Sequence, residues 1–174
     1  MFYYSSTLNV IIIKGLKNKM GNLIYLTIEG NQQGLISRGC GTLDSIGNKC
    51  QEGKEDEIII IEYSSTITRN QNVSHHPIEF IKNIDKSSPL LLVAISNNEV
   101  LKLTFDFYRT SQHCKNEKYY TIVLNQASIV DYSTRYPHSI NSNSSQPEES
   151  VLVQYRDITC SHHIAGTSGY SIAD

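Results

Sequence analysis

The 174-residue sequence predicts a mainly β protein, an antiparallel sandwich or barrel with one short helix. Three observations lead to this prediction. Apolar and polar residues alternate in several short segments, as they do in half-buried strands. β-branched residues are concentrated in these segments. Only one segment, residues 88–98, carries signals for both the start and the end of a helix. We expect about seven or eight strands from this pattern.

The composition indicates one nearly neutral domain. Apolar residues make up 39% of the chain, charged residues 18%, and the net charge is -2. A chain of this length is typical of a single domain. No basic stripe points to nucleic acid, and no apolar run reaches the roughly 18 residues of a membrane span. We therefore expect neither nucleic acid nor a membrane among its partners.

Residues 1–19 precede the regular pattern. Their apolar run, Val10–Ile13, is short, and the lysines follow it, whereas a signal peptide has its positive charges before a longer run. We expect these residues to form a disordered extension, with translation from Met20 as the alternative. The predicted domain spans residues 20–174.

The first predicted strand is residues 23–29, where Ile24, Leu26 and Ile28 share one face. The glycine-rich segment that follows, residues 30–57, is predicted to be mostly loop, with a short extended piece near Leu35.

Two more extended segments come before the helix. Residues 58–68 are rich in β-branched side chains and predict one strand, buried on both faces at its start. Residues 77–84 predict a further strand.

The helix is expected to begin at Ser88, whose hydroxyl suits the N-cap, with Pro89 at the first helical position. Asn97 or Asn98 can adopt the left-handed conformation that ends a helix. The face expected to cover the sheet consists of Leu91, Leu92 and Ile95.

The second half of the chain predicts a hairpin followed by two strands. Residues 100–110 alternate most clearly, and residues 117–132 form the return strand. Residues 133–150 are polar and predict a long exposed loop. Residues 151–164 predict one long strand, and residues 167–172 a short final one.

The stretch ITCSHHIAG, residues 158–166, raises the question of a metal or catalytic site. Cys160 and His162 lie two residues apart and share a face of a strand, whereas His163 points to the other face. A structural zinc site needs four converging ligands, and catalysis needs a nucleophile, a base and an orienting group together. We therefore expect no metal, no cofactor and no enzymatic activity. A metal-binding or hydrolytic domain that uses Cys160, His162 and a third ligand remains the less favoured alternative.

The four cysteines, Cys40, Cys50, Cys114 and Cys160, contain no CxxC pair. The sequence does not choose among their three connectivities, and reduced thiols are the simpler interpretation. Two long loops, 30–57 and 133–150, stand on a scaffold without a catalytic pattern. Loops of this length are uncommon unless they are functional, so the residues indicate an interaction or structural protein.

A family resemblance then becomes visible from Met20 onward. The segments that carry it, in this order, read MGNLIYLTIEGNQQGLI, NVSHHPIEFIKNIDKSSPLLLVAI, FDFYRT, YYTIVL, QPEESV and IAGTSGYS. Together they closely resemble the haemolysin-coregulated protein family, Hcp, which forms the tube of bacterial type VI secretion systems, and in particular its enterobacterial branch. The resemblance covers nearly all of residues 20–172.

The resemblance implies a compact antiparallel β-barrel of two sheets with one short flanking α-helix. It also implies a homohexameric ring, and rings that stack into a tube within a contractile sheath. A VgrG-type spike protein and small effectors in the channel are the other implied partners. The protein is then expected first in the bacterial cytoplasm and afterwards outside the cell, exported by type VI secretion without a signal peptide.

Two candidate surfaces follow from the resemblance alone. The loop 40–54 is implied to contact the next ring, and the strand 57–68 to line the channel. The residues of the stacking loop are Gly41, Thr42, Leu43, Asp44, Ser45, Ile46, Gly47 and Asn48. The residues of the channel-lining strand are Ser64, Thr66 and Thr68.

The chain also departs from the family pattern. Many relatives carry Trp, in a Trp-x-His pattern, where this chain has Cys160 before Ser161 and His162. A smaller side chain there predicts a cavity unless neighbours fill it. Because the chain ends at Asp174, directly after the expected fold, no C-terminal toxin domain is expected. A secreted Hcp-like effector or passenger is the alternative function.

Overall fold

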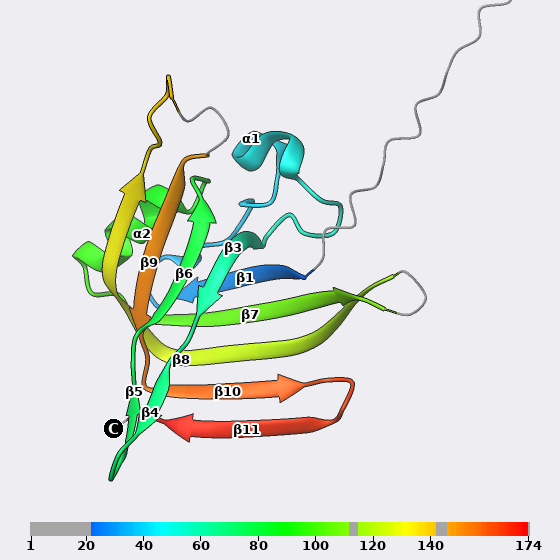
Figure 1. The fold of residues 1–174 in the computed structure, drawn as a ribbon. Coiled ribbons are helices and arrows are strands. Elements are labelled where there is room, and N and C mark those ends of the chain that lie inside the picture. Colours follow the sequence, from blue (N-terminus) through cyan, green and yellow to red (C-terminus); the bar gives the residue numbers. More distant parts are fainter. Residues whose placement is uncertain (1–21, 112–114, 142–145, 174) are drawn as a thin grey trace, which may run out of the picture.

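The computed structural model describes residues 22–111, 115–141 and 146–173. The expected extension 1–19 and Cys114 lie outside this part. Figure 1 shows the arrangement of the strands and helices. The strands are β1 (Leu23–Gly30), β2 (Gly34–Leu35), β3 (Ile58–Ser64), β4 (Ile67–Arg69), β5 (Val73–His75), β6 (Ile78–Asn83), β7 (Leu101–Thr110), β8 (Asn116–Arg135), β9 (Glu148–Gln154), β10 (Asp157–His162) and β11 (Thr167–Ile172). The helices are α1 (Leu43–Ile46), the 3₁₀ helix η1 (Gly47–Lys49) and α2 (Ser88–Ser96).

The main sheet closes into a barrel. Its strands follow the order β11-β10-β8-β7-β1-β3-β6-β9, and β9 pairs again with β8. Every pairing of this sheet is antiparallel. The closed ring therefore runs from β8 through β7, β1, β3, β6 and β9 back to β8, while β10 and β11 extend it on one side. The predicted fold class, a two-sheet antiparallel barrel with a short flanking helix, is confirmed.

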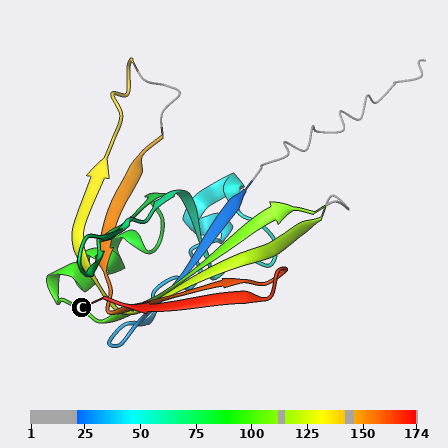
Figure 2. The same ribbon diagram turned by 60° about the horizontal axis from the view of Figure 1, so that its bottom comes forward.

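The strand β8 contributes to both sides of the barrel because it is long and bent. Its first part pairs with β7 and β10, and its last part, from Ser128, pairs with β9. Between these parts Gln126 has a φ of 48°, and the register to β9 shifts between Ile129 and Asp131. Such irregularities bend a strand and increase its twist. Figure 2 shows the two parts of the barrel diverging from this bend.

The barrel interior is filled by side chains from the strands around it. Strand alternation predicts which side chains of β1 and β7 point inward. Residues with no exposed surface include Leu26, Ile28, Ile58, Phe80, Leu103, Phe105, Leu124 and Val153. The strand β3 is buried on one face only, because Ile61 is 48% exposed while Ile58 and Ile60 are buried.

The helix α2 begins differently from the prediction. Its N-cap is Ser87, and Ser88 lies inside the helix. The Asp85 carboxylate accepts hydrogen bonds from the backbone N–H and the hydroxyl of Ser87, at 2.8 and 2.5 Å. The Ser88 hydroxyl instead accepts from the N–H of Asp85 and donates to the Glu149 carboxylate. The helix start is therefore stabilised by Asp85 rather than by the expected cap.

The buried face of α2 also differs in one position. Leu91 and Ala94 are buried, whereas Leu92 is 55% exposed. The predicted face was therefore right for Leu91 and Ile95, which packs against the core, and wrong for Leu92. After the helix, Asn98 has a φ of 48°, which confirms the predicted left-handed end.

Three predicted boundaries are wrong. The expected strand 58–68 is divided between β3 and β4, and β4 pairs only with β5, in a separate two-stranded sheet. The expected strand 151–164 is divided at Tyr155–Arg156, where β9, paired with β6, ends and β10, paired with β8, begins. The expected loop 133–150 is shorter, because β8 extends to Arg135 and β9 begins at Glu148. The first two errors fall where the chain changes its strand partners, and the third where polar residues continue the β8–β9 pairing. Local alternation reveals neither.

A buried charged cluster joins α2 to the barrel and was missed in the sequence. Lys82 has no exposed surface, and its Nζ lies 2.6 Å from Glu149 and 3.1 Å from Asp85. Glu149 also accepts hydrogen bonds from the hydroxyls of Ser88 and Tyr132, at 2.8 and 2.6 Å. Buried charges persist only when paired and hydrogen-bonded, as these are. Burial, and the hydrogen bond to Glu149, raise the pKa of Tyr132 to about 12.

Candidate assembly surfaces

The predicted stacking loop is a folded segment rather than an irregular loop. Thr42 donates from its hydroxyl to the carbonyl of Gly39 at 2.7 Å, α1 follows, and Gly47 ends it with a φ of 61°. Gly41 is buried, and its N–H donates to the carbonyl of Glu55 at 2.9 Å. A Cβ atom on Gly41 would lie 1.9 Å from the carbonyl oxygen of Lys54. Only glycine therefore allows the two arms of this segment to approach so closely.

The tip of this segment is exposed. Leu43 has 65% of its surface exposed, and Asp44, Gly47 and Asn48 are exposed as well. Ser45 and Ile46 are half-buried. A rigid segment with an exposed leucine and an adjacent carboxylate is suited to contact another protein, because little conformational entropy is lost on binding.

Lys54 holds the base of the segment against the barrel. Its Nζ donates to Glu57 at 2.8 Å and to the Tyr108 hydroxyl at 2.7 Å, and it lies 4.5 Å from the centre of the Tyr25 ring. Burial opposes the charge, but the hydrogen bonds to Glu57 and Tyr108 outweigh it and raise the pKa of Lys54. Tyr25, on the outer face of β1, is only 2% exposed as a result of this cover.

The two long loops meet at one end of the barrel. Lys49 Nζ donates to Asn83 at 3.0 Å and to the side-chain oxygen of Gln146, which lies two residues before the start of β9. Figure 1 shows α1 and the end of the β8–β9 pair at the top, with β4, β5 and the C-terminus at the bottom. The sequence did not predict that these loops share a surface, because they are far apart along the chain.

The three residues expected to line a channel are not on one strand. Ser64 ends β3, Thr66 lies between strands, and Thr68 is in β4; all three are exposed. The carbonyl of Thr66 accepts from the N–H of His76 at 3.1 Å, and the Thr68 hydroxyl lies 3.0 Å from His76 Nε2. These residues therefore follow the edge of the barrel and continue onto the β4–β5 hairpin.

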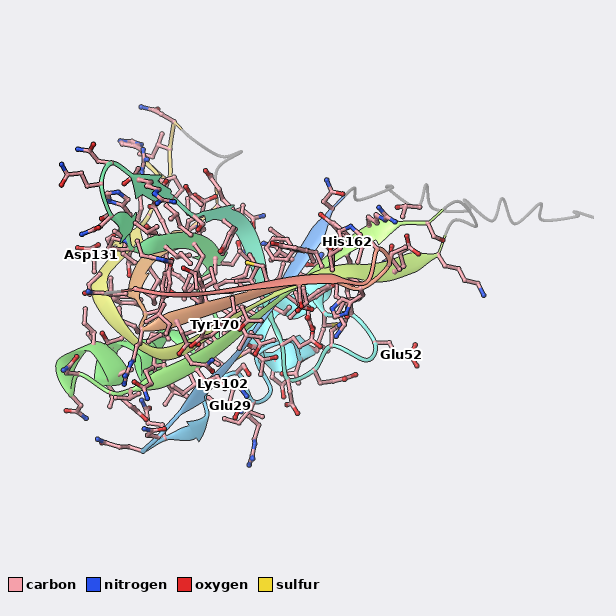
Figure 3. The ribbon with its side chains drawn as sticks, turned by 90° about the horizontal axis from the view of Figure 1, so that it is seen from below. Glu29, Glu52, Lys102, Asp131, His162 and Tyr170 are labelled. Atoms are coloured by element: carbon pink, nitrogen blue, oxygen red, sulfur yellow. The ribbon has the colours of Figure 1, made fainter. Side chains whose placement is uncertain are left out.

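The strand β11 has an open edge. It pairs with β10 from Thr167 to Ile172, and no other strand of the described ranges pairs with it. Tyr170 is 62% exposed and Ile172 51% exposed, on the same face. Figure 3 views the molecule from below and labels Tyr170 on this strand. An exposed edge with apolar side chains is a template for pairing with another strand. The two apolar residues at i and i+2 in the last predicted strand were the available sequence signal.

The cysteine and histidines of ITCSHHIAG do not converge. His162 Nδ1 accepts from the N–H of Ala165 at 3.1 Å, and His163 Nε2 lies 2.7 Å from the hydroxyl of Thr121. Within residues 22–111, 115–141 and 146–173, no group of three or more His, Cys, Asp or Glu side chains is placed to hold a metal ion. The described free cysteines are Cys40, Cys50 and Cys160.

Aromatic side chains surround Cys160, the position where tryptophan was expected from the resemblance. Ile122 lies directly opposite Cys160 in β8, and Tyr120 lies opposite His162. The Tyr120 ring is 6.2 Å from that of His162 and 5.6 Å from that of Phe107. Cys160 and Tyr120 both pack against the core. Burial, and the neighbouring Cys160, raise the pKa of Tyr120 to about 12. The smaller cysteine is therefore accompanied by tyrosine, phenylalanine and histidine rings.

No helix within the described part of the chain is long and apolar enough to cross a membrane.

Solved structures share this fold over most of the chain. The crystal structure of an Hcp protein has a TM-score of 0.83 and 30% sequence identity, covering 88% of this chain and 98% of that one. The secreted protein Hcp3 from Pseudomonas aeruginosa has a TM-score of 0.80 and 38% identity, covering 88% of this chain and 99% of that one.

Sequence comparisons give the same result. Residues 25–162 match the family described as type VI secretion system effector, Hcp. The "Major exported protein" of Pseudomonas aeruginosa is 38% identical over 165 residues, with 86% of this chain and 94% of that protein covered. The protein YhhZ of Escherichia coli (strain K12) is 43% identical over 149 residues, with 85% of this chain covered. The chain spans 37% of the length of YhhZ.

Proposed function

The chain belongs to the Hcp family of type VI secretion tube subunits, and from this we propose that six copies form a ring and that rings stack into a tube. Each subunit then contacts its neighbours in the ring through one pair of surfaces and the adjacent rings through another. Head-to-tail contacts of this kind close into rings when the rotation allows it and continue as filaments along the stacking direction.

The open edge of β11 carries this proposal. It presents unpaired backbone groups together with the exposed side chains of Tyr170 and Ile172. Pairing with a neighbouring copy would cover these side chains and the unpaired backbone groups. Among the described strands β11 pairs only with β10, so this pairing would occupy its free edge. Hexameric assembly through this edge fits a barrel that is otherwise closed.

Light scattering after size exclusion, together with negative-stain imaging, tests the proposal. We expect a hollow ring with the mass of six subunits. The double variant Tyr170→Asp, Ile172→Asp is expected to be monomeric, because two carboxylates would be buried at the edge. Leu92→Asp, an exposed apolar position on α2, is the control and should still form rings. A chain that stays monomeric at high concentration, with residues 1–19 removed, would contradict the proposal.

In this assembly the segment Gly41–Asn48 contacts the next ring, and Ser64, Thr66 and Thr68 face the channel. The exposed tip at Leu43 supports the first assignment, and the exposed hydroxyl side chains support the second. A VgrG-type spike at the tube end, a surrounding sheath, and small effectors within the channel complete the proposed partners. Export from the bacterial cytoplasm would then follow sheath contraction, without a signal peptide.

A role after export is the second candidate. The relative in Pseudomonas aeruginosa is named "Major exported protein", and the matching family is described as an effector. Deleting this chain and measuring export of an unrelated spike-bound effector distinguishes the two roles. Export should stop if the chain builds the tube. Unchanged export, in a strain without a second copy of the family, would instead identify the chain as a passenger.

A further inference from the structure

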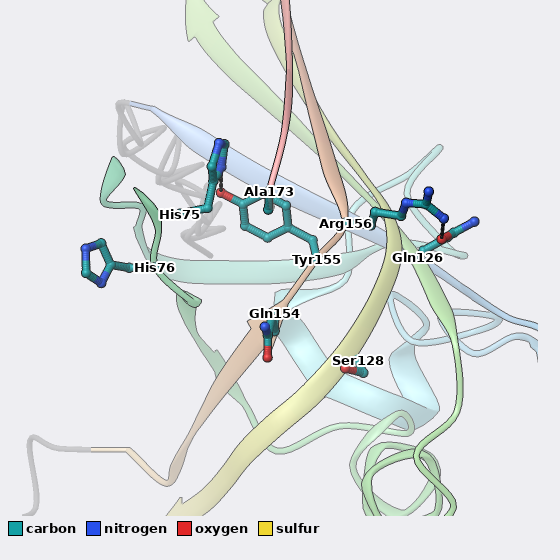
Figure 4. A pocket seen from close by; sticks show the side chains of 8 residues that line it. All are labelled: His75, His76, Gln126, Ser128, Gln154, Tyr155, Arg156 and Ala173. Carbon is teal, nitrogen blue, oxygen red and sulfur yellow. Dashed lines mark hydrogen bonds between the residues drawn. The ribbon is translucent and has the colours of Figure 1, made fainter. Parts of the chain in front are cut away.

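A polar pocket lies at the end of the barrel opposite α1. Its volume is about 400 Å³, and it is bordered by the β4–β5 hairpin, the bend of β8, the corner between β9 and β10, and Ala173 after β11. The side chains that matter here are His75, His76, Gln126, Ser128 and Arg156 (Figure 4). Neither the sequence patterns nor the family resemblance pointed to this pocket.

The pocket is held in shape by its own hydrogen bonds. His75 Nδ1 lies 3.0 Å from the hydroxyl of Tyr155, and His75 Nε2 lies 3.0 Å from that of Ser171. These contacts fix the hairpin against the barrel and β11. The backbone of Gln126 has a φ of 48°, a conformation that non-glycine residues rarely adopt. Strained residues of this kind concentrate at functional sites, and here the strain directs a side-chain amide toward Arg156.

The pocket offers hydrogen-bond donors to an anion. The guanidinium of Arg156 is exposed, and its Nη1 donates to the side-chain oxygen of Gln126 at 3.1 Å. Among the described residues, this is the only side-chain partner of the guanidinium. The Ser128 hydroxyl lines the same pocket, and none of the described lining residues is Asp or Glu. The neighbouring hairpin, residues 65–77, contains Arg69, His75 and His76 but no carboxylate. An arginine in such surroundings binds carboxylates with two parallel hydrogen bonds.

The opposite end of the subunit has the complementary charge. Residues 40–57 contain five carboxylates and two lysines. Both lysines, Lys49 and Lys54, are already bonded within the subunit. Asp44 is exposed on α1 beside Leu43, at the tip of the segment. Figure 1 places α1 at the top and the pocket's hairpin at the bottom of the same molecule.

We propose that the pocket at Arg156 receives the Asp44 carboxylate of a second copy of this chain, in the next ring of the stack. The inference rests on the proposed stacking of rings and names the surface that accepts the α1 segment. A donor at one end and its acceptor at the other form a heterologous contact, which propagates without limit along an axis. Leu43 then lies against the apolar side chains of the hairpin, where Ile67 is 47% and Val73 44% exposed.

Neutralising Arg156 tests the contact. Ring formation and ring stacking are measured separately, by light scattering of dilute protein and by sedimentation velocity with negative-stain imaging of concentrated protein at low salt. Arg156→Gln should keep rings but weaken ring–ring association by at least ~10-fold, because the loss repeats in every subunit. Arg156→Lys keeps the charge but loses the two parallel hydrogen bonds, so its association should lie between that of Arg156→Gln and that of the unaltered protein. Lys102→Gln, at a cation that is 50% exposed and does not line the pocket, is the matched control and should stack normally.

A charge exchange identifies the partner residue. Arg156→Asp and Asp44→Arg should each abolish stacking, whereas the double variant should restore it at least ~10-fold relative to either single variant, since the pair is rebuilt in the opposite sense. If Arg156→Asp prevents stacking and Asp44→Arg does not rescue it, another group occupies the pocket and the assignment is wrong. If both single variants stack like the unaltered protein, the pocket is not part of the interface.

Disulfide capture excludes an indirect effect. Asp44→Cys and Arg156→Cys, combined in a background with Cys50→Ser and Cys114→Ser, should form cross-links between rings on mild oxidation, because bridged cysteines need Cα atoms within about 7 Å. Stacked rings that never cross-link would overturn the proposal. If unaltered protein forms no rings at all, the proposed function fails, and that result is separate from rings that form but stack independently of Arg156.

Discussion

Single residues decide how the α2 side of the barrel and the α1 segment are held. Lys82, buried without exposed surface, is surrounded by carboxylates and hydroxyls that satisfy its charge. Gly41 occupies a position where a side chain has no room. Both residues are buried, and both fix parts of the structure on which the proposed interfaces depend.

Lys82→Met is expected to lower the free energy of unfolding by ~3–5 kcal/mol, because it leaves Glu149 and Asp85 buried without their cation. Urea denaturation measures this change. Lys102→Met, which removes an exposed lysine 4.0 Å from Glu29, should change stability by no more than ~0.5 kcal/mol. Equal effects of the two substitutions would show that the buried cluster adds nothing specific.

Gly41→Ala is expected to destabilise the protein by ~1–3 kcal/mol, as overpacking does, and to loosen the α1 segment. The physical reason is the 1.9 Å approach of a new Cβ to the Lys54 carbonyl. Denaturation and limited proteolysis within residues 41–57 measure the two effects. Gly169→Ala, in β11 with no atom within 4 Å of the new Cβ, is the control and should be neutral or slightly stabilising. An unchanged cleavage rate in Gly41→Ala would contradict the expectation.

At the scale of elements, the sequence predicted what depends on local pattern. The strands β1 and β7 and the helix α2 follow from alternation and helix signals. The division of residues 151–164 at Tyr155 does not, because the chain there leaves β6 as a partner and follows β8 around its bend. Glu149 was placed in the predicted loop 133–150. In the structure it lies in β9, where Lys82 from a distant strand satisfies its charge. The pocket at Arg156 likewise consists of residues from four separate segments.

The end of α2 offers a test at this scale. Asn98 has a φ of 48° after the helix, where glycine has no steric cost. Asn98→Gly should leave the stability of the protein unchanged or raise it by a few tenths of a kcal/mol. Asn98→Val should lower it by ~1 kcal/mol or more, because a β-branched residue is strained there. Thermal unfolding compares the two, and equal melting temperatures would show that the left-handed turn is not maintained.

For the molecule as a whole, alkaline pH is expected to be destabilising. Burial raises the pKa of Cys40 to about 12, and it contributes to raising the pKa values of Tyr120 and Tyr132 to about 12. In the unfolded chain a cysteine titrates near ~8.5 and a tyrosine near ~10. Above those values the native state binds more protons than the unfolded state, so stability falls as pH rises toward 12.

Urea unfolding between pH 7 and 11 measures this dependence. Stability should be constant up to about pH 8 and then decline, first from the cysteine and then from the tyrosines. Cys40→Ala should remove the earliest part of the decline, whatever its effect on stability at pH 7. A midpoint that does not change between pH 8.5 and 10.5 would contradict the expected protonation of these buried groups.

Because β9 closes the barrel, the closed barrel forms only late in synthesis of the chain. The strand β1 is synthesised early, but the ring of strands stays open until β9, Glu148–Gln154, is available to join β6 and β8. At roughly 5–20 residues per second, a ribosome needs many seconds to cover that distance. During this interval the apolar faces of β1, β3 and β7 have no complete barrel to enter. Every new copy therefore passes through a period in which exposed apolar faces favour aggregation, and rapid pairing of β9 with β6 and β8 ends that period.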